Sequence, residues 1–132
     1  MPGPSARSIF GITPNKTYQD LVRESKTRIK EVSAQDATQL LQERPDAVII
    51  DCREPNESAL GRIPGAVVMP RGVLEQSIER SVPRDRTVIV YCASGNRSAL
   101  AADVLMQMGY ADVASMAGGI RGWVDAGGEL EG

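Results

Sequence analysis

Short apolar runs that lack apolar–polar alternation recur along the chain. They cover residues 47–50, 66–69, 87–92 and 112–116. Strands buried on both faces of a parallel sheet have continuous apolar runs of this kind, rich in valine and isoleucine. A more polar stretch at 29–32 suits an edge strand. The pattern therefore predicts about five parallel strands.

Amphipathic segments separate these runs. The segment that follows Ser33 has helical spacing, begins after a residue favoured as an N-cap and stops at Pro45. Further helices are predicted at 57–60, 72–80 and 98–108, with a short glycine-bounded helix at 118–128. Strands that alternate with helices predict an α/β domain whose parallel sheet carries helices on both faces.

Another amphipathic helix precedes this pattern. Four residues lie at helical spacing after a possible capping pair, Thr17 and Asp20; the four are Tyr18, Leu21, Val22 and Ser25. We divide the chain into an N-terminal extension, 1–27, that carries this helix, and a single domain, 28–132. The first sixteen residues are expected to be loose. The helix could pack on the domain, form a dimer contact or act as a lid.

The composition excludes several classes of function. The 132 residues are 42% hydrophobic and 24% charged, as in an ordinary globular domain. The 15 basic residues are scattered among 17 acidic ones, for a net charge of −2. The sequence therefore lacks the clustered basic residues that are typical of nucleic-acid binding. No apolar run approaches the roughly 18 residues that span a bilayer, and no secretory signal is recognisable. We expect a cytoplasmic protein that does not bind membranes.

The chain has two cysteines, Cys52 and Cys92, and no histidine. Two cysteines forty positions apart do not indicate a disulfide framework. Without histidine, the chain cannot form a Cys/His zinc site or activate a nucleophile with an imidazole base. No metal or cofactor is expected, and any nucleophile must be activated in another way.

Cys92 ends the most apolar strand, in the stretch "VIVYCASGNRS". Ligands of open parallel sheets bind beyond the carboxyl ends of strands, where loops lead into helices. Gly95 and Asn96 tolerate positive φ, and small side chains leave the loop amides uncovered. Such a loop forms an anion cradle, and a helix N-terminus lowers the pKa of a nearby thiol. We therefore interpret Cys92 as a reactive thiolate.

Three motifs together resemble the rhodanese-like, single-domain sulfurtransferases over about residues 29 to 127. They are "CASGNRS" with the strand before it, "GYADVASMAGGIRGW", and "IIDCREPNESALGRIPGAVVMPR". The resemblance implies that Cys92 takes a sulfane sulfur from a small donor such as thiosulfate, becomes a persulfide, and passes the sulfur to a thiol or cyanide. It also implies that the loop binds the persulfide or the donor, with Arg97 adding charge; the loop comprises Ala93, Ser94, Gly95, Asn96, Arg97 and Ser98.

The same resemblance places Asp51 and Arg53 near the pocket. Asp51 is expected to bond the loop backbone and Arg53 an acidic partner, or the two to form a buried ion pair; we favour the structural role for Asp51. Cys52 lies between them and should point to the opposite face of the sheet, because strand residues alternate. A packed core thiol is favoured over a resolving or sensing thiol, which would need exposure near Cys92.

Two residues depart from the family pattern, and the first of them bears on the substrate. Ala93 is neutral, whereas members that use thiosulfate often have arginine or lysine after the nucleophile. The sulfur donor could therefore be a compound other than thiosulfate. Arg62 replaces a histidine that is usual in the upstream turn. We infer little from that second change.

Other functions compete with sulfur transfer. Tyrosine phosphatases use a similar thiolate with Cys-x5-Arg spacing, but Cys92 and Arg97 have the spacing Cys-x4-Arg. Arsenate reduction would require a resolving thiol. A non-catalytic binding or regulatory module is also possible, although such members typically lose the loop cysteine. The oligomeric state is left open between monomer and homodimer.

Overall fold

The computed structural model describes residues 15–132. Five strands form one parallel sheet in the order β1-β5-β4-β2-β3. Their bounds are β1 Lys30–Val32, β2 Val48–Asp51, β3 Val67–Val68, β4 Val88–Tyr91 and β5 Val113–Met116. The five-stranded parallel sheet predicted from the apolar runs is confirmed. The loose segment predicted for the first sixteen residues lies almost wholly outside the described residues.

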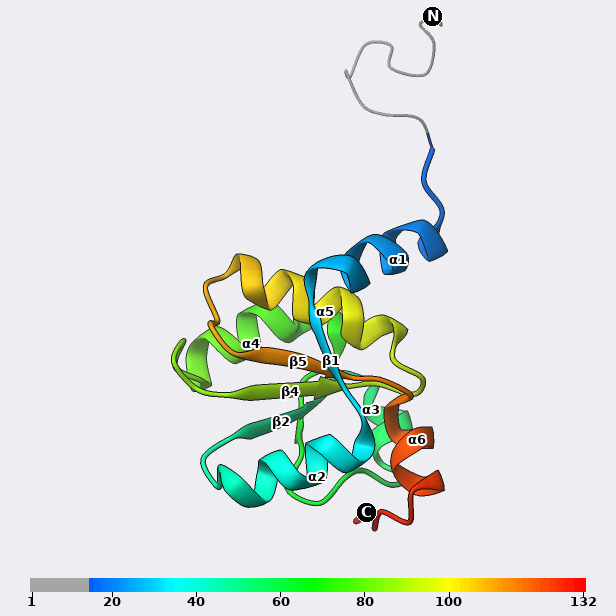
Figure 1. The fold of residues 1–132 in the computed structure, drawn as a ribbon, viewed down its shortest axis with the longest axis vertical. Helices are drawn as coiled ribbons and strands as arrows, with labels where there is room; N and C mark the ends of the chain where they lie inside the picture. The colour runs from blue at the N-terminus through cyan, green and yellow to red at the C-terminus, as the bar shows by residue number, and fades with distance from the viewer. Residues whose placement is uncertain (1–14) are drawn as a thin grey trace, which may run out of the picture.

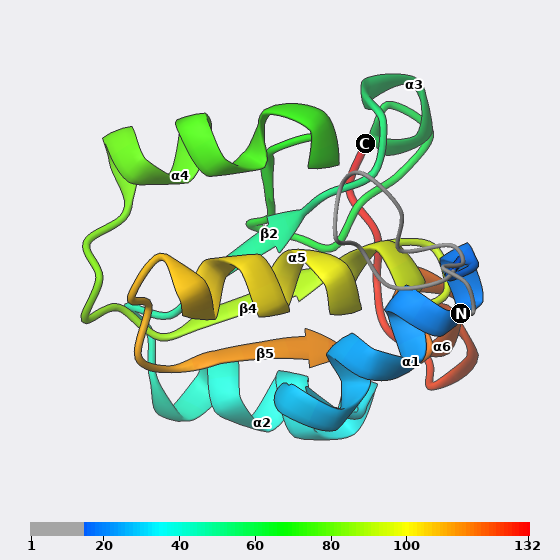
Figure 2. The same cartoon turned by 90° about the horizontal axis from the view of Figure 1, so that it is seen from above.

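Helices cover both faces of the sheet, as Figures 1 and 2 show. On one face, α4 (Leu74–Ser81) and α5 (Asn96–Gln107) pack on alternate residues of the central strands. On the other face, α2 (Ala34–Glu43) and α6 (Gly119–Asp125) do so. All residues of β4 and β5 are buried, as expected for strands between two helical layers.

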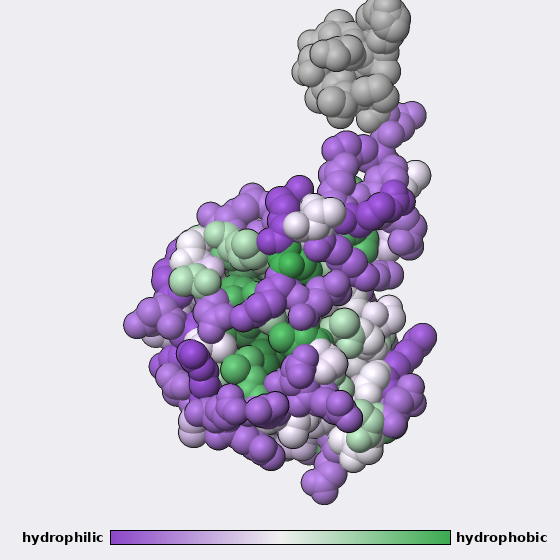
Figure 3. All heavy atoms as spheres, viewed as in Figure 1, coloured by the Kyte–Doolittle hydropathy of each residue, from purple (hydrophilic) through white to green (hydrophobic). Residues whose placement is uncertain are grey.

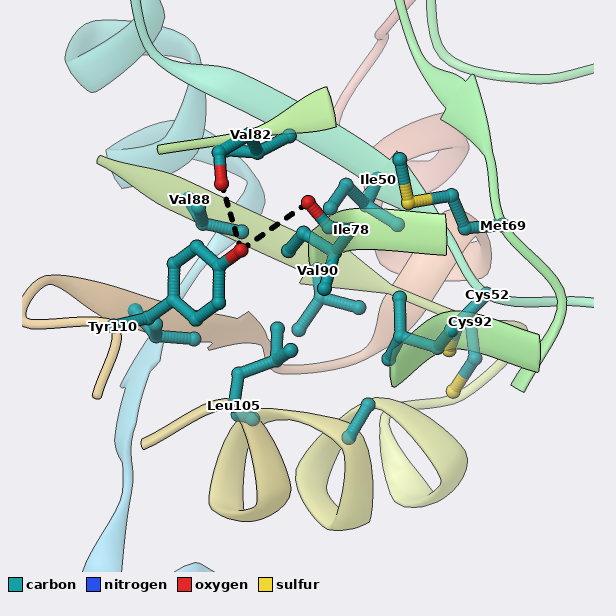
Figure 4. Close-up of a cluster of buried hydrophobic side chains, with 14 residues drawn as sticks. Ile50, Cys52, Met69, Ile78, Val82, Val88, Val90, Cys92, Leu105 and Tyr110 are labelled. Carbon is teal, nitrogen blue, oxygen red and sulfur yellow. Dashed lines mark hydrogen bonds between the residues drawn. The ribbon is translucent and has the colours of Figure 1, made fainter. Parts of the chain in front are cut away.

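The two faces have separate apolar clusters. One contains Ile50, Val88 and Val90, with Tyr110 donating its hydroxyl to the carbonyls of Ile78 and Val82 (Figure 4). The other contains Ile49, Ile89, Tyr91, Met116 and Trp123. Figure 3 shows apolar side chains between the helical layers, on the side where β1 lies in front. Among residues 15–132, no helix combines the length and apolar character needed to cross a bilayer.

The N-terminal helix α1 (Tyr18–Arg28) packs on α5. Thr17 and Asp20 form the predicted capping box. Ser25 and Arg28 both bond Asp103 of α5, at 2.9 and 2.6 Å for their shortest contacts. Tyr18 is 49% exposed and only Val22 and Ser25 are buried, so the apolar face is covered in part.

Several helix boundaries differ from the predicted ones. α5 begins at Asn96, two residues early, because Gly95 adopts a left-handed conformation and serves as the N-cap. The helix predicted at 57–60 is α3 (Pro55–Ser58). It begins earlier because Glu54 is its N-cap, Pro55 occupies its first position, and Glu57 accepts the Glu54 amide. The helix predicted at 72–80 divides into a 3-10 turn, Arg71–Val73, and α4.

Candidate active site

Cys92 directly follows β4 at the carboxyl edge of the sheet, and a short loop joins it to α5. Its Sγ accepts hydrogen bonds from the backbone amides of Gly95 at 3.1 Å and Ser98 at 3.4 Å. The Ser98 hydroxyl lies 3.5 Å from the same sulfur and donates to it when the sulfur is a thiolate. Three donors from the loop and the first turn of α5 therefore converge on one atom.

Two glycines allow this loop to close around the sulfur. Gly95 has φ +103°, and a β-carbon there would lie 3.3 Å from the amide nitrogen of Gly118. Gly119 has φ +59°, and its β-carbon would lie 2.5 Å from carbonyl atoms of Cys92 and Ala93. The amide of Ile120 also donates to the Cys92 carbonyl at 2.9 Å. The start of α6 thus packs against the loop and holds its backbone in place.

Ser115 of β5 supports the Ser98 hydroxyl. The two hydroxyl oxygens are 2.8 Å apart, and both residues are fully buried. When Ser98 uses its one hydroxyl hydrogen to donate to the Cys92 thiolate, Ser115 is the donor within this pair. The sequence reasoning missed Ser115, whose only signal was a polar residue inside an apolar strand.

Cys52 lies beside Cys92 on the same face of the sheet. Asp51 pairs with Tyr91 in the parallel register, and the Cys52 amide donates to the Tyr91 carbonyl at 3.0 Å, so the next pair along is Cys52 and Cys92. Both side chains belong to one buried cluster, and Figure 4 shows their sulfur atoms side by side. Cys52 is fully buried, as the strand alternation predicted.

This environment makes Cys92 the thiolate of the pair. The adjacent Cys52 thiol, with the hydrogen bonds from Ser98 and Gly95, outweighs burial and lowers the pKa of Cys92 to about 4. The neighbouring Cys92 sulfur, together with burial, raises the pKa of Cys52. Cys92 is the cysteine whose pKa is lowered because the loop amides donate to its sulfur.

Asp51 and Arg53 form a buried ion pair at the end of β2, 2.7 Å between the closest atoms. The amide that Asp51 accepts is that of Arg53, at 3.0 Å, and not one of the active-site loop, so Asp51 has the structural role favoured for it above. The acidic partner of Arg53 is Asp51 itself. Asp51 and Arg53 lie two residues apart at the end of one strand. Their charged groups therefore bond each other, and neither bonds the active-site loop.

Two further groups complete this network. The Tyr91 hydroxyl donates to Asp51 at 2.8 Å and accepts the Ile63 amide, while Arg53 donates to the Gly61 carbonyl. Burial alone would raise the pKa of Asp51, but the hydrogen bonds from Arg53 and Tyr91 hold that pKa below its usual value. The network fastens β2, β4 and the following turn together.

Arg97 forms a bidentate ion pair with Glu57 of α3, at 2.8 and 3.0 Å. The pair lowers the pKa of Glu57 to about 2 and raises that of Arg97. The charge that Arg97 was expected to add to the site is therefore largely balanced. Glu57 was not among the predicted site residues, because nothing local in the sequence links it to a loop forty positions away.

The remaining loop residues lie at the rim. Ser94 is exposed, and Ala93 and Asn96 are partly exposed. Beside the loop is a surface cavity of about 540 Å³. Its lining combines charged residues with apolar ones; these are Arg53, Glu57, Arg121 and Asp125, and Leu60, Ile120, Val124 and Leu130. Among the described residues, no three His, Cys, Asp or Glu side chains gather closely enough to hold a metal ion.

A thiolate at the carboxyl end of a parallel sheet, held by the amides of a strand-to-helix loop, defines a rhodanese-type site. Residues 33–126 match the family described as Rhodanese-like domain, and the chain belongs to that family.

Three relatives illustrate the range of similar proteins. A sulfurtransferase of Allochromatium vinosum is 37% identical over 95 residues, 72% of this chain and 88% of that protein. A Rhodopseudomonas palustris protein of unknown function, described as a possible tyrosine phosphatase, has a similar structure, with a TM-score of 0.80 and 36% identity over 91% of this chain and 98% of its own. The polysulfide-sulfur transferase homodimer of Wolinella succinogenes has a TM-score of 0.76 and 30% identity, with 86% of each chain covered.

Proposed function

We propose that the protein is a sulfurtransferase that carries a sulfane sulfur as a persulfide on Cys92. The observation that carries this proposal is the convergence of Gly95 and Ser98 donors on the Cys92 sulfur, with a pKa of about 4. A thiolate is the nucleophilic form of cysteine, so Cys92 needs no proton-accepting base. This explains how a chain without histidine can support the chemistry.

The reaction has two displacement steps. The Cys92 thiolate attacks the sulfane sulfur of the donor, an S–S bond forms, and the donor leaves with the electron pair of its broken bond. The thiolate of the acceptor then attacks the outer sulfur, takes it as its own persulfide, and releases Cys92 as a thiolate. The loop amides stabilise negative charge on the bound sulfur in both steps.

The charges on the active-site loop itself favour a persulfide or polysulfide donor over thiosulfate, although Arg121 of α6 also lines the neighbouring cavity. Ala93 is neutral, and Glu57 balances the guanidinium of Arg97. A sulfonate group, which thiosulfate carries, would have no uncompensated loop cation to bind. The similar Wolinella succinogenes protein is a polysulfide-sulfur transferase, which is consistent with this choice.

Phosphate-ester hydrolysis is the second candidate, because one similar structure is described as a possible tyrosine phosphatase. The geometry disfavours it in two ways. The Cys-x4-Arg loop is one residue shorter than the phosphatase loop, and Arg97 is bound by both oxygens of Glu57.

A donor panel tests the proposal. Purified protein is assayed with thiosulfate, a polysulfide and glutathione persulfide, with a thiol acceptor, and in parallel with an aryl phosphate. We expect sulfur transfer, fastest with the persulfide or polysulfide, that is lost in Cys92→Ser and retained in Ser77→Ala on α4. Phosphatase turnover that depends on Cys92, without sulfur transfer, would contradict the proposal.

A further inference from the structure

Cys52 is a second buried thiol that forms no bond to the transferred sulfur in the transfer steps. Exposure is expected of a thiol that senses or resolves from solution, but Cys52 adjoins Cys92 within the apolar cluster and needs no exposure to reach the Cys92 sulfur. It sits opposite Cys92 on the neighbouring strand and shares its cluster. Neighbouring strands are about 4.8 Å apart, a separation within the about 4.4–6.8 Å between α-carbons that a disulfide spans. The two sulfurs also lie on the same face of the sheet (Figure 4).

The loop donors and Cys52 approach the Cys92 sulfur from different directions. The loop amides and the Ser98 hydroxyl reach its sulfur from α5 and the loop. Cys52 reaches it from β2, within the apolar cluster. An outer sulfur held by the loop donors would thus leave the inner sulfur open to Cys52. An external acceptor meets the outer sulfur first, because Cys92 is only 1% exposed.

We propose that Cys52 is a resolving thiol that attacks the inner sulfur of the Cys92 persulfide and releases sulfide when no acceptor is present. This inference rests on the proposed function. The Cys52–Cys92 disulfide bond forms as the bond between the two sulfurs of the persulfide breaks. The outer sulfur leaves with that electron pair and with the Cys52 proton, as HS⁻.

The electrons balance within the protein. The sulfane sulfur is reduced to sulfide, and the two cysteine sulfurs are oxidised to a disulfide, so no external oxidant takes part. A dithiol then reopens the disulfide and returns Cys92. Cys52 therefore adds a second fate for bound sulfur: transfer follows attack on the outer sulfur by an acceptor, and sulfide release follows attack on the inner one.

The test loads reduced protein with a polysulfide, removes excess donor rapidly, and follows the protein without acceptor. Sulfide is measured colorimetrically, and the cysteines are mapped by mass spectrometry of digested protein. We expect wild type to release about one sulfide per loaded chain and to form a Cys52–Cys92 cross-linked peptide. Cys52→Ser and Cys52→Ala should keep the persulfide on Cys92. They should lose roughly nine-tenths or more of the sulfide release, because the chain has no other cysteine that could attack the persulfide.

Two variants guard against a folding artefact. Cys52→Ser and Cys52→Ala differ in polarity at a buried position, and both are compared by circular dichroism with wild type. A persulfide that persists equally in wild type and in these variants, with no cross-linked peptide, would overturn the inference and leave the proposed function standing. Failure of every variant, wild type included, to gain sulfur would overturn both.

Discussion

Ser98 reaches the sulfur of Cys92 with two of its groups, the backbone amide at 3.4 Å and the hydroxyl at 3.5 Å. The amide is fixed by the first turn of α5, and the hydroxyl is oriented by Ser115 at 2.8 Å. Ser98 therefore supplies one backbone donor, which a substitution keeps, and one side-chain donor, which a substitution removes. Removing the hydroxyl leaves the loop backbone in place.

We expect Ser98→Ala to raise the pKa of Cys92 by about one to two units, because a hydrogen bond to a charged group contributes about 1.5–3 kcal/mol. The pH dependence of the alkylation rate by iodoacetamide measures this pKa. Ser98→Thr should restore the wild-type profile, and Ser77→Ala should leave it unchanged. Identical profiles for Ser98→Ala and wild type would show that the hydroxyl does not act on the sulfur.

The lowered pKa of Cys92 also predicts how stability depends on pH. The folded protein has a Cys92 pKa of about 4, whereas an unfolded cysteine titrates near about 8.5. Between these values the unfolded chain binds a proton that the folded chain does not. The free energy of unfolding should therefore rise with pH by roughly 1 kcal/mol per unit in this window, relative to Cys92→Ser.

Urea titrations of wild type and Cys92→Ser from about pH 4.5 to about pH 8, a range that lies between the two pKa values, measure this difference. The contribution is fully present above the unfolded pKa and is lost as pH falls through the folded pKa. While Cys92 is an unmodified thiolate, its proximity and the burial of Cys52 raise the pKa of Cys52 and keep that thiol protonated in the folded protein throughout the window. Equal pH slopes for the two proteins would mean that Cys92 is not a thiolate near neutral pH.

Gly119 should be sensitive to the smallest substitution. Gly119→Ala places a β-carbon against carbonyl atoms of Ala93 and Cys92 and strains a backbone with φ +59°. We expect a loss of about 1–3 kcal/mol in the free energy of unfolding and a lower transfer rate, because the loop must move away from the sulfur. Gly72→Ala, where a β-carbon meets nothing within 4 Å, is the matched control. Equal stability and turnover for the two variants would refute this role.

The Asp51–Arg53 pair should contribute to stability through its burial. Arg53→Met leaves the Asp51 carboxylate buried without its cation and should cost about 3–5 kcal/mol in thermal or urea unfolding. Asp51→Asn combined with Arg53→Met should be less destabilised than Arg53→Met alone. Arg23→Met, which removes an exposed partner of Asp20, should change little. A small loss in Arg53→Met would indicate that Asp51 is satisfied without it.

The sequence predicted the fold well because buried strands carry their signal locally. The apolar runs at 47–50 and 87–92 gave the central strands β2 and β4. The strand order was not visible, since it depends on which edges pair and not on any one run. Helix starts shifted where a backbone conformation decided them, as with the left-handed Gly95 before α5.

The site divides in the same way. The loop from Cys92 to Ser98 could be recognised because its glycine, its small residues and its cysteine are contiguous. Glu57 and Ser115 could not, because only the packing of α3 and β5 brings them to the loop. The alternation of strand residues correctly turned Cys52 into the core, but its place beside Cys92 required the register of β2 against β4.

The persulfide on Cys92 is the central claim, and peptide mass spectrometry tests it most directly. Reduced wild type and Cys92→Ser are mixed briefly with a polysulfide, quenched with an alkylating agent, digested and mapped. We predict a gain of about 32 Da, one sulfur atom, on the peptide that contains Cys92 in wild type and no gain at that position in Cys92→Ser. Equal sulfur uptake by the two proteins, or uptake at Cys52 alone, would contradict the account.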